Sequence, residues 1–216
     1  MPPWGVVELR MLYLTGSGLV AVVSFGGVLE GYGWENRLAT LDVEALCLSD
    51  AKGRWYLDGC DGCGSADEML DAIGAFFEKR PGHEWLMIGQ SAGGYAALRY
   101  ADQFNAGAVV FAPQTHQFWT NVGPGLTQIT MPIDVPDIRG DLLFRSRTKP
   151  IHVVISTSES GNTDGRAWGD RIHVAGLEQL ENFHVHRVEH DKHAVAFHLA
   201  RSGLLDDYLL LGIKPE

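Results

Sequence analysis

The length and composition of the chain are those of a globular protein. It has 216 residues, of which 45% are hydrophobic, so a sizeable core can form within one folded unit. The formal net charge of −10 argues against nucleic acid or an anionic membrane surface as a partner. The chain shows neither a signal-peptide pattern nor an apolar run near the roughly 20 residues of a membrane span, so we expect a cytoplasmic protein.

Two apolar segments near the start of the chain predict strands. Residues 6–14 and 18–25 have the composition of strands, and the turn-forming residues between them predict a hairpin. The second strand runs into Gly26-Gly27. A glycine pair just past a central strand allows backbone N–H groups to turn toward a ligand, so Gly27 is a candidate donor to an oxyanion.

A helix, a strand and a glycine-rich loop with two cysteines follow. Residues 34–41 predict a short helix, and residues 45–49 predict the next strand. Cys60 and Cys63 have the spacing of half a zinc site or of a redox pair. The chain has three cysteines and no second pair of this kind, so we interpret these thiols as incidental and expect no metal.

The helix at residues 66–80 has the clearest end signals of the chain. Ser65 and Glu68 form a capping box at its start, and Pro81-Gly82 ends it. One apolar stripe runs along it, made of Met69, Leu70, Ile73, Phe76 and Phe77.

A strand, a sharp turn and a helix are predicted over residues 84–102. Trp85 to Ile88 form an apolar run typical of a buried parallel strand, and helical spacing begins at Ala92. The turn between them, Gly89-Gln-Ser-Ala-Gly-Gly94, has the G-x-S-x-G pattern of a nucleophile elbow, which holds a serine above the carboxyl end of a sheet. Ser91 is therefore the candidate nucleophile, and the helix N-terminus at Ala92 would face developing negative charge. The alternative is a serine that only caps the helix.

The second half of the chain alternates strands and helices around one irregular stretch. Strands are expected at 106–112, 151–155 and 183–188, and helices at about 171–180 and 194–211. Residues 113–149 lack periodicity, and we expect a small cap or substrate loop there. The alternation predicts an α/β fold in one domain, residues 1–216, with a doubly wound, mostly parallel sheet of about seven strands flanked by helices.

The histidines after the last predicted strand supply candidates for a general base. Loops that follow parallel strands open on one edge of the sheet, where partners of Ser91 are expected. His193 immediately precedes the C-terminal helix and is the favoured base, with His190 as the alternative. His198 falls inside the helix, which favours a packing or surface role.

The loop after the strand at 151–155 supplies candidates for the acid, because the order to look for is serine, acid, histidine. Glu159 is nearest the strand end, and Asp164 lies in the middle of the loop. Asp170 stands just before the predicted helix and could equally be its N-cap. The spacing leaves these three alternatives open.

Several of these motifs together resemble a known superfamily. They are Phe25-Gly-Gly27, Leu48-Ser-Asp50 with Trp55-Tyr56, the elbow from Ile88 to Ala97, Asp170-x-x-His173, and His193-x-Val195. The chain resembles an α/β-hydrolase with a minimal cap and, more narrowly, small bacterial hydrolase-like proteins of cell-surface polysaccharide contexts. The resemblance implies Ser91 as nucleophile, His193 as base and Asp170 as acid. One departure is Phe25, which stands where many relatives have histidine.

The function implied is that of a serine hydrolase acting on a small-molecule acyl substrate. It would cleave a carboxylic ester, or a related acyl bond, through an acyl-enzyme, with the oxyanion between the N–H groups of Gly27 and Ala92. No metal or organic cofactor is implied. The alternatives are an acyltransferase with the same triad, a peptidase or thioesterase, and a non-catalytic binding module of the same fold.

Overall fold

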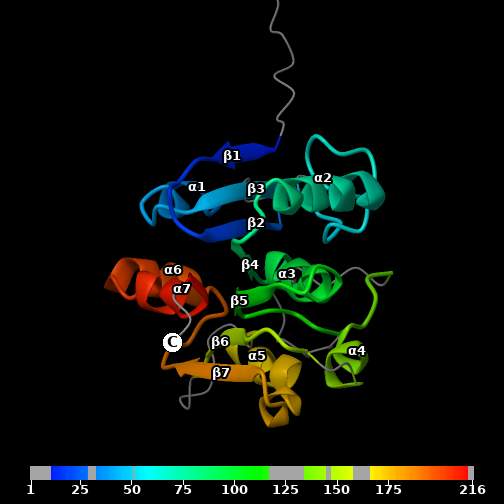
Figure 1. Ribbon diagram of the computed structural model, residues 1–216. Helices are drawn as coiled ribbons and strands as arrows, with labels where there is room; N and C mark the ends of the chain where they lie inside the picture. The colour runs from blue at the N-terminus through cyan, green and yellow to red at the C-terminus, as the bar shows by residue number, and fades with distance from the viewer. Residues whose placement is uncertain are drawn as a thin grey trace, which may run out of the picture.

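The strands join in one sheet in the computed structural model, which describes residues 11–28, 33–50, 52–116, 134–144, 147–157 and 166–213. The described strands follow the order β1-β3-β2-β4-β5-β6-β7, from top to bottom in Figure 1. Their bounds are β1 Leu12–Leu14, β2 Val20–Val28, β3 Glu44–Asp50, β4 Glu84–Gln90, β5 Gly107–Phe111, β6 Ile151–Ser156 and β7 Phe183–Val188. β1 pairs antiparallel with β3, and the other neighbours pair parallel, which confirms the predicted sheet class.

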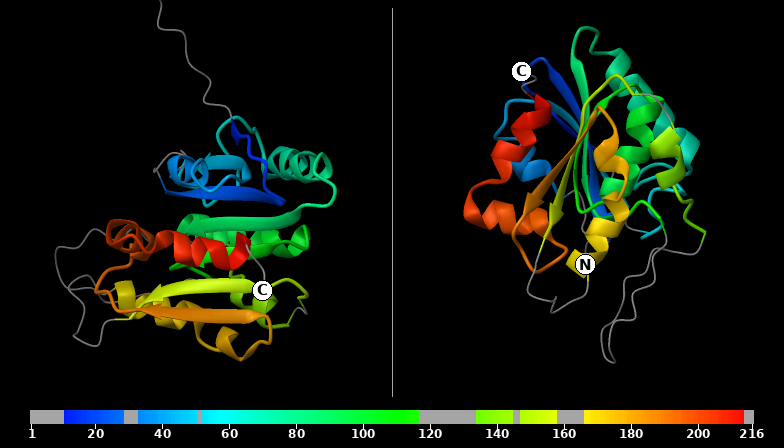
Figure 2. Two further views of the ribbon diagram at one scale, coloured as in Figure 1. Left: turned by 60° about the vertical axis from the view of Figure 1, so that its left-hand side comes forward. Right: turned by 90° about the horizontal axis from the view of Figure 1, so that it is seen from below.

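Helices cover both faces of this sheet, as the view from below in Figure 2 shows. One face carries α1 (Glu35–Leu38), α6 (Val195–Ser202) and α7 (Leu205–Ile213). The other carries α2 (Ala66–Glu78), α3 (Ala92–Gln103), α4 (Arg139–Phe144) and α5 (Arg166–Val174). A short 3-10 helix, η1 (Leu177–Gln179), follows α5. This arrangement is the doubly wound layering that alternating strands and helices predict.

Apolar side chains fill both faces because successive residues of a strand point to opposite sides of the sheet. In β4, Leu86 and Ile88 belong to the core beneath α6 and α7, whereas Met87 belongs to the core beneath α2 and α3. All three are at most 2% exposed. A strand that is buried on both faces has apolar residues at successive positions, which explains the continuous apolar run in β4.

The predicted N-terminal hairpin is wrong, because β1 and β2 are not neighbours in the sheet. Leu12 pairs with Cys47 of β3, while β2 is flanked by β3 and β4. The turn between β1 and β2 instead contacts Asp42, whose carboxylate accepts hydrogen bonds from the backbone N–H and hydroxyl of Ser17 at 3.0 and 2.6 Å. The apolar β2 strand lies in the sheet interior, and the shorter β1 is left at the edge.

Two helices end at glycines that the sequence prediction placed inside them. The expected C-terminal helix is divided at Gly203, which has a φ of +76°, into α6 and α7. The helix expected at 171–180 runs from Arg166 to Val174, and Gly176, with a φ of +86°, separates it from η1. Left-handed glycines commonly end helices, because their backbone avoids the steric cost of a Cβ.

The predicted cap at residues 113–149 lies partly outside the described residues, which omit 117–133 and 145–146. Helix α4 lies in the described part, and its Leu142 is buried in the core on the face of the sheet that α2, α3 and α5 cover. The cap therefore stays a prediction. Of the helices that the structure describes, none combines the length and apolar character that a bilayer crossing needs.

Candidate active site

The nucleophile elbow adopts the strained conformation that its pattern predicts. Ser91 has φ +54° and ψ −116°, a combination that non-glycine residues rarely adopt. The turn needs close backbone approach: a Cβ on Gly89 would lie 2.2 Å from the carbonyl oxygen of Gly93, and one on Gly93 would lie 2.3 Å from that of Phe25. The backbone N–H of Ser91 donates to the carbonyl oxygen of Phe111 at 2.9 Å and ties the turn to β5.

The hydroxyl of Ser91 faces a histidine and does not cap the helix. Ser91 is the N-cap residue of α3 by position, but its side chain makes no capping hydrogen bond. Its Oγ lies 2.9 Å from Nε2 of His193 instead. The helix-cap interpretation of this serine is therefore not what the structure shows.

His193 links Ser91 to Asp170. Nδ1 of His193 lies 2.6 Å from Oδ1 of Asp170, whose side chain is 1% exposed, against 14% for His193. An ionised carboxylate only accepts hydrogen bonds, so Nδ1 must carry the proton. Nε2 of a neutral His193 is then the acceptor for the Ser91 hydroxyl. The three side chains form one hydrogen-bonded series directed at the serine.

Asp170 lies inside α5, four residues after its first residue, and is not an N-cap. The sequence prediction started this helix at about residue 171, which left a cap and a triad acid competing for one carboxylate. Because α5 begins at Arg166, that competition does not arise. The other two candidates, Glu159 and Asp164, lie outside the described residues.

A second buried residue of α5 holds this helix to the loop after β5. Nδ1 of His173 accepts a hydrogen bond from the backbone N–H of Thr115 at 3.1 Å. The hydroxyl of Thr115 donates to the backbone carbonyl of His173 at 2.7 Å. Burial, with smaller contributions from His116 and His193, lowers the pKa of His173 to about 3, so its ring stays neutral. Sequence reasoning missed Thr115, which no motif marks.

The loop that carries His193 is held from two sides. The hydroxyl of Ser156, at the end of β6, donates to the backbone carbonyl of Lys192 at 2.5 Å. Oε1 of Gln90 accepts from the backbone N–H of Ala196 at 3.0 Å. The alternative base, His190, stacks on His198 with ring centroids 4.1 Å apart.

The two candidate oxyanion donors lie on neighbouring elements. Ala92 is the first residue of α3. Gly26 and Gly27 were expected just past a strand, but β2 continues to Val28, and the pair sits in a register shift between Phe25 and Val28. The contact of Gly93 with the carbonyls of Phe25 and Gly26 brings this end of β2 against the first turn of α3.

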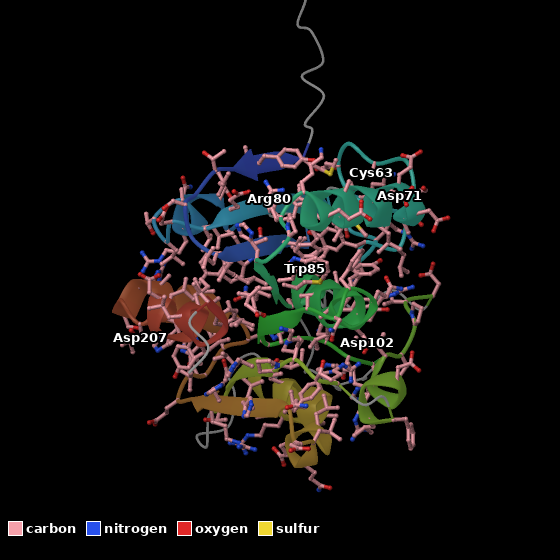
Figure 3. All side chains as sticks on the ribbon, in the orientation of Figure 1. Cys63, Asp71, Arg80, Trp85, Asp102 and Asp207 are labelled. Carbon is pink, nitrogen blue, oxygen red and sulfur yellow. The ribbon has the colours of Figure 1, made fainter. Side chains whose placement is uncertain are left out.

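The Cys60 and Cys63 thiols are free and buried. Cys63 lies between the start of α2 and the β1 edge of the sheet, where its sulfur is 3.9 Å from that of Met11 (Figure 3). Burial raises the pKa of Cys60, which keeps it a thiol. Within the described ranges, no group of three or more metal-ligating side chains could hold an ion.

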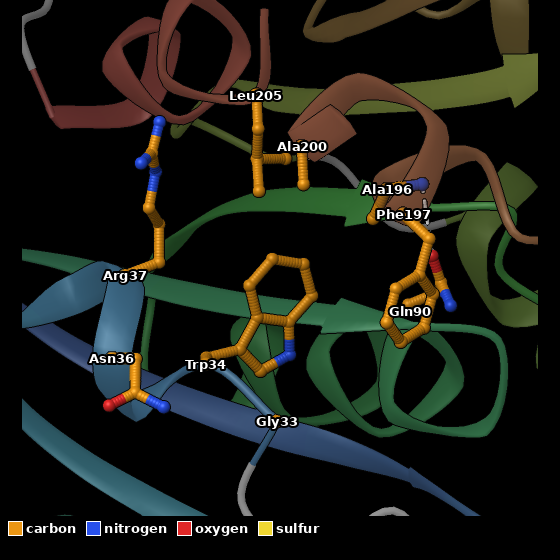
Figure 4. Close-up of a pocket in the computed structure, with 9 residues that line it drawn as sticks. All are labelled: Gly33, Trp34, Asn36, Arg37, Gln90, Ala196, Phe197, Ala200 and Leu205. Carbon is orange, nitrogen blue, oxygen red and sulfur yellow. Dashed lines mark hydrogen bonds between the residues drawn. The ribbon is translucent and has the colours of Figure 1, made fainter. Parts of the chain in front are cut away.

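A pocket of about 420 Å³ opens on the α1 and α6 side of the sheet (Figure 4). Trp34, Phe197 and Leu205 supply apolar walls, and Gln90 and Ala196, joined by their hydrogen bond, form one end. Gln90 directly precedes Ser91, and Ala196 follows His193 by three residues. The pocket therefore borders the two segments that carry the serine and the histidine.

Comparison with known proteins places the fold. The sequence matches no protein-family model and no curated protein. Among solved structures, a lipase-esterase related protein from Clostridium acetobutylicum has a TM-score of 0.59 at 14% identity, over 92% of this chain and 98% of that one. Carboxyl esterase 2 from Tuber melanosporum has a TM-score of 0.59 at 16% identity, over 95% and 84%. Carboxylesterase CesB from Bacillus subtilis has a TM-score of 0.57 at 12% identity, over 96% and 92%.

The chain has the α/β-hydrolase fold. Among its structural neighbours are esterases and lipases, at identities too low to carry more than the fold. In this fold the nucleophile follows a central strand at a G-x-S-x-G turn, and the acid and histidine follow in that order. Ser91, Asp170 and His193 occur in the same order here.

Proposed function

We propose that this protein is a serine hydrolase that cleaves a carboxylic ester, or a related acyl bond, of a small molecule. The observation that carries the proposal is the hydrogen-bonded series from Asp170 through His193 to Ser91. The strained elbow beneath Ser91 and the esterase and lipase structures of the same fold support it. Ser91 is proposed as nucleophile, His193 as general base and Asp170 as the acid that orients it.

The proposed reaction forms and then hydrolyses an acyl-enzyme. His193 takes the Ser91 proton as Oγ attacks the acyl carbonyl, and Asp170 stabilises the resulting imidazolium. The oxyanion is proposed to accept hydrogen bonds from the N–H groups of Gly27 and Ala92, each worth about 3–4 kcal/mol in the transition state. His193 then protonates the leaving alcohol. A water molecule, deprotonated by His193, releases the acid and restores Ser91.

The pocket of Figure 4 supports an apolar group in the substrate. Its volume lies in the range of small-molecule sites, which are mostly apolar with a few polar groups that set orientation. Arg37 lines it but forms an ion pair with Asp206, so its charge already has a partner within the chain. We propose that the acyl or alkyl chain of the ester occupies this pocket.

Hydrolysis of p-nitrophenyl esters by the purified protein and by Ser91→Ala tests the proposal. The parent protein is expected to release nitrophenol and free acid, and Ser91→Ala is expected to lose at least a thousandfold in rate. Adding an acceptor alcohol separates hydrolase from acyltransferase, because a transferase yields a new ester at the expense of the acid. An inert parent protein on a broad panel of acyl substrates would instead favour a binding module.

A further inference from the structure

The end of β2 contains a bulge opposite β3, and the proposed oxyanion donor Gly27 lies within it. Phe25 pairs with Leu48 and Val28 pairs with Asp50, so β2 advances three residues while β3 advances two. On the other side of β2, the last pair with β4 is Phe25 with Gly89. A bulge leaves ladder groups without their usual partners and is common beside active sites. The backbone groups of Gly26 and Gly27 can therefore bind elsewhere.

The buried side chain of Tyr56 binds one of these backbone groups, the carbonyl of Gly26. The hydroxyl of Tyr56 lies 2.9 Å from the carbonyl oxygen of Gly26, to which it donates, and 3.2 Å from that of Leu48. Its ring is fully buried and packs edge-on against Phe25, with centroids 5.1 Å apart. Burial, with a smaller contribution from the charge of Asp50, raises the pKa of Tyr56 well above its ordinary value. The phenol therefore keeps its proton and acts as a donor.

Holding the Gly26 carbonyl also fixes the direction of the next N–H. The carbonyl of Gly26 and the N–H of Gly27 belong to one planar trans peptide, in which the two bonds point in opposite directions. Because the carbonyl is directed at Tyr56, the Gly27 N–H is directed away from it. A flexible Gly-Gly peptide would otherwise rotate freely, since neither residue has a Cβ to restrict it.

The backbone of Tyr56 is itself held in an unusual conformation. Trp55 and Tyr56 have φ angles of +61° and +62°, two consecutive non-glycine residues in the left-handed region. The buried carboxylate of Asp50 accepts both their backbone N–H groups, at 2.5 and 3.3 Å. The hydroxyl of Tyr100 donates to the Tyr56 carbonyl at 3.0 Å. Strain of this kind persists where surrounding contacts over-determine it, which is characteristic of functional sites.

We propose that Tyr56 is a positioning residue for the oxyanion hole. It fixes the Gly26–Gly27 peptide so that the Gly27 N–H is directed at the substrate oxyanion when Ser91 attacks. The inference rests on the proposed function, because it assigns Tyr56 a role in that same site. Asp50 supports this role by holding the backbone that presents the Tyr56 ring.

Tyr56→Phe tests the proposal, because it removes the hydroxyl and keeps the ring that packs on Phe25. We expect kcat to fall by about 10- to 100-fold, with KM within about twofold, because one oxyanion donor loses its alignment. The pH dependence of kcat/KM should not move, since the Tyr56 hydroxyl donates to the backbone carbonyls of Gly26 and Leu48 and not to the base. Affinity for a trifluoromethyl ketone, which forms a tetrahedral oxyanion with the serine, should fall as much as kcat.

Tyr95→Phe is the matched control, because Tyr95 is a buried tyrosine of the same core whose hydroxyl donates to Pro136 instead, at 3.0 Å. Equal losses of kcat and ketone affinity in both variants, or no loss in Tyr56→Phe, would overturn the proposal.

A second measurement uses the parent protein and so does not depend on the folding of a variant. In parent protein labelled with 15N-glycine, the Gly27 amide proton should shift downfield when the ketone binds, and an unmoved signal would overturn the proposal.

Failure of the proposed role of Tyr56 can be distinguished from failure of the proposed serine-hydrolase function. If Ser91→Ala retains the parent activity, the serine-hydrolase proposal fails whatever Tyr56→Phe does. If Ser91→Ala is inactive and Tyr56→Phe has the parent kcat and ketone affinity, only the positioning role fails.

Discussion

The carboxylate of Asp170 lies 2.6 Å from Nδ1 of His193 and is carried by the interior of α5, not by its first turn. This relationship separates two roles that a carboxylate near a helix start can have. An N-cap would contribute about 1 kcal/mol to stability and little to rate. A triad acid holds the tautomer of the base and stabilises its imidazolium, so it contributes mainly to rate.

We therefore expect Asp170→Asn to lower kcat by about 10⁴ with only a small change in melting temperature, because the amide favours the wrong histidine tautomer. Steady-state kinetics and thermal melting measure both quantities. Glu159→Gln and Asp164→Asn, the other two candidates from the sequence, should each stay within about tenfold of the parent kcat. A large loss in Asp164→Asn with a near-normal rate for Asp170→Asn would move the acid to Asp164.

The pH dependence of the rate should report His193. The base must be neutral to accept the Ser91 proton, so kcat/KM should rise with pH as the base loses its own proton. His193→Ala should abolish the activity. His190→Ala, which removes the ring stacked on His198, should leave most of the activity and the same pH profile. The reverse pattern in the two variants would assign the base to His190.

His173 should make the folded state sensitive to acid. Its pKa is lowered to about 3 in the folded chain from 6.5, so between these values the unfolded chain binds a proton that the folded chain does not. The stability that depends on this neutral ring is present above about pH 6.5 and is lost as pH falls toward 3. The contribution is at most about 1.4 kcal/mol per pH unit.

The measurement is the melting temperature from pH 7 to pH 4, compared between the parent and His173→Gln. The pKa of His152 is likewise lowered, to about 4, and contributes in the same direction in both proteins. We expect a shallower fall in His173→Gln, together with a lower melting temperature at pH 7, because the hydrogen bond from Thr115 is disturbed. Equal slopes in the parent and in His173→Gln would contradict the assignment.

Filling the pocket of Figure 4 should change acyl-chain preference without impairing the chemistry. Ala200 lines this pocket and is exposed, so Ala200→Trp should fold and occupy part of its volume. We expect kcat/KM for octanoyl esters to fall at least tenfold relative to acetyl esters, equivalent to about 1.4 kcal/mol. Arg201→Trp, an exposed position on the same helix that does not line the pocket, is the control. An unchanged ratio of octanoyl to acetyl rates in Ala200→Trp would exclude this pocket as the acyl site.

The local sequence pattern predicted the elements around Ser91, whereas contacts between segments far apart in the chain are shown only by the structure. A Cβ on Gly89 would meet the Gly93 carbonyl within the turn, whereas one on Gly93 would meet the carbonyl of Phe25 in β2. The elbow could still be identified from six consecutive residues, because both glycines belong to its local pattern. The pairing of β1 with β3 depends on which strand takes the sheet interior, and the local turn between β1 and β2 wrongly predicted a hairpin.

The same distinction applies within the candidate site. Reasoning from the residues left Asp170 as one of three candidate acids, because its contact with His193 joins residues 23 apart in the chain. Thr115 donates a hydrogen bond to His173, which is 58 residues away in the chain. Tyr56 donates one to Gly26, which is 30 residues away. Neither contact has a fixed spacing in the chain that a motif could record.

Reaction with a fluorophosphonate, read by mass spectrometry, tests most directly whether Ser91 is an activated nucleophile, because it requires no knowledge of the natural substrate. The parent protein should gain one phosphonyl group, and peptide mapping should place it on Ser91. His193→Ala should react much more slowly, and Ser91→Ala should neither be labelled nor hydrolyse esters. A parent protein that stays unlabelled, a label on another residue, or esterase activity that survives in purified Ser91→Ala would contradict the account.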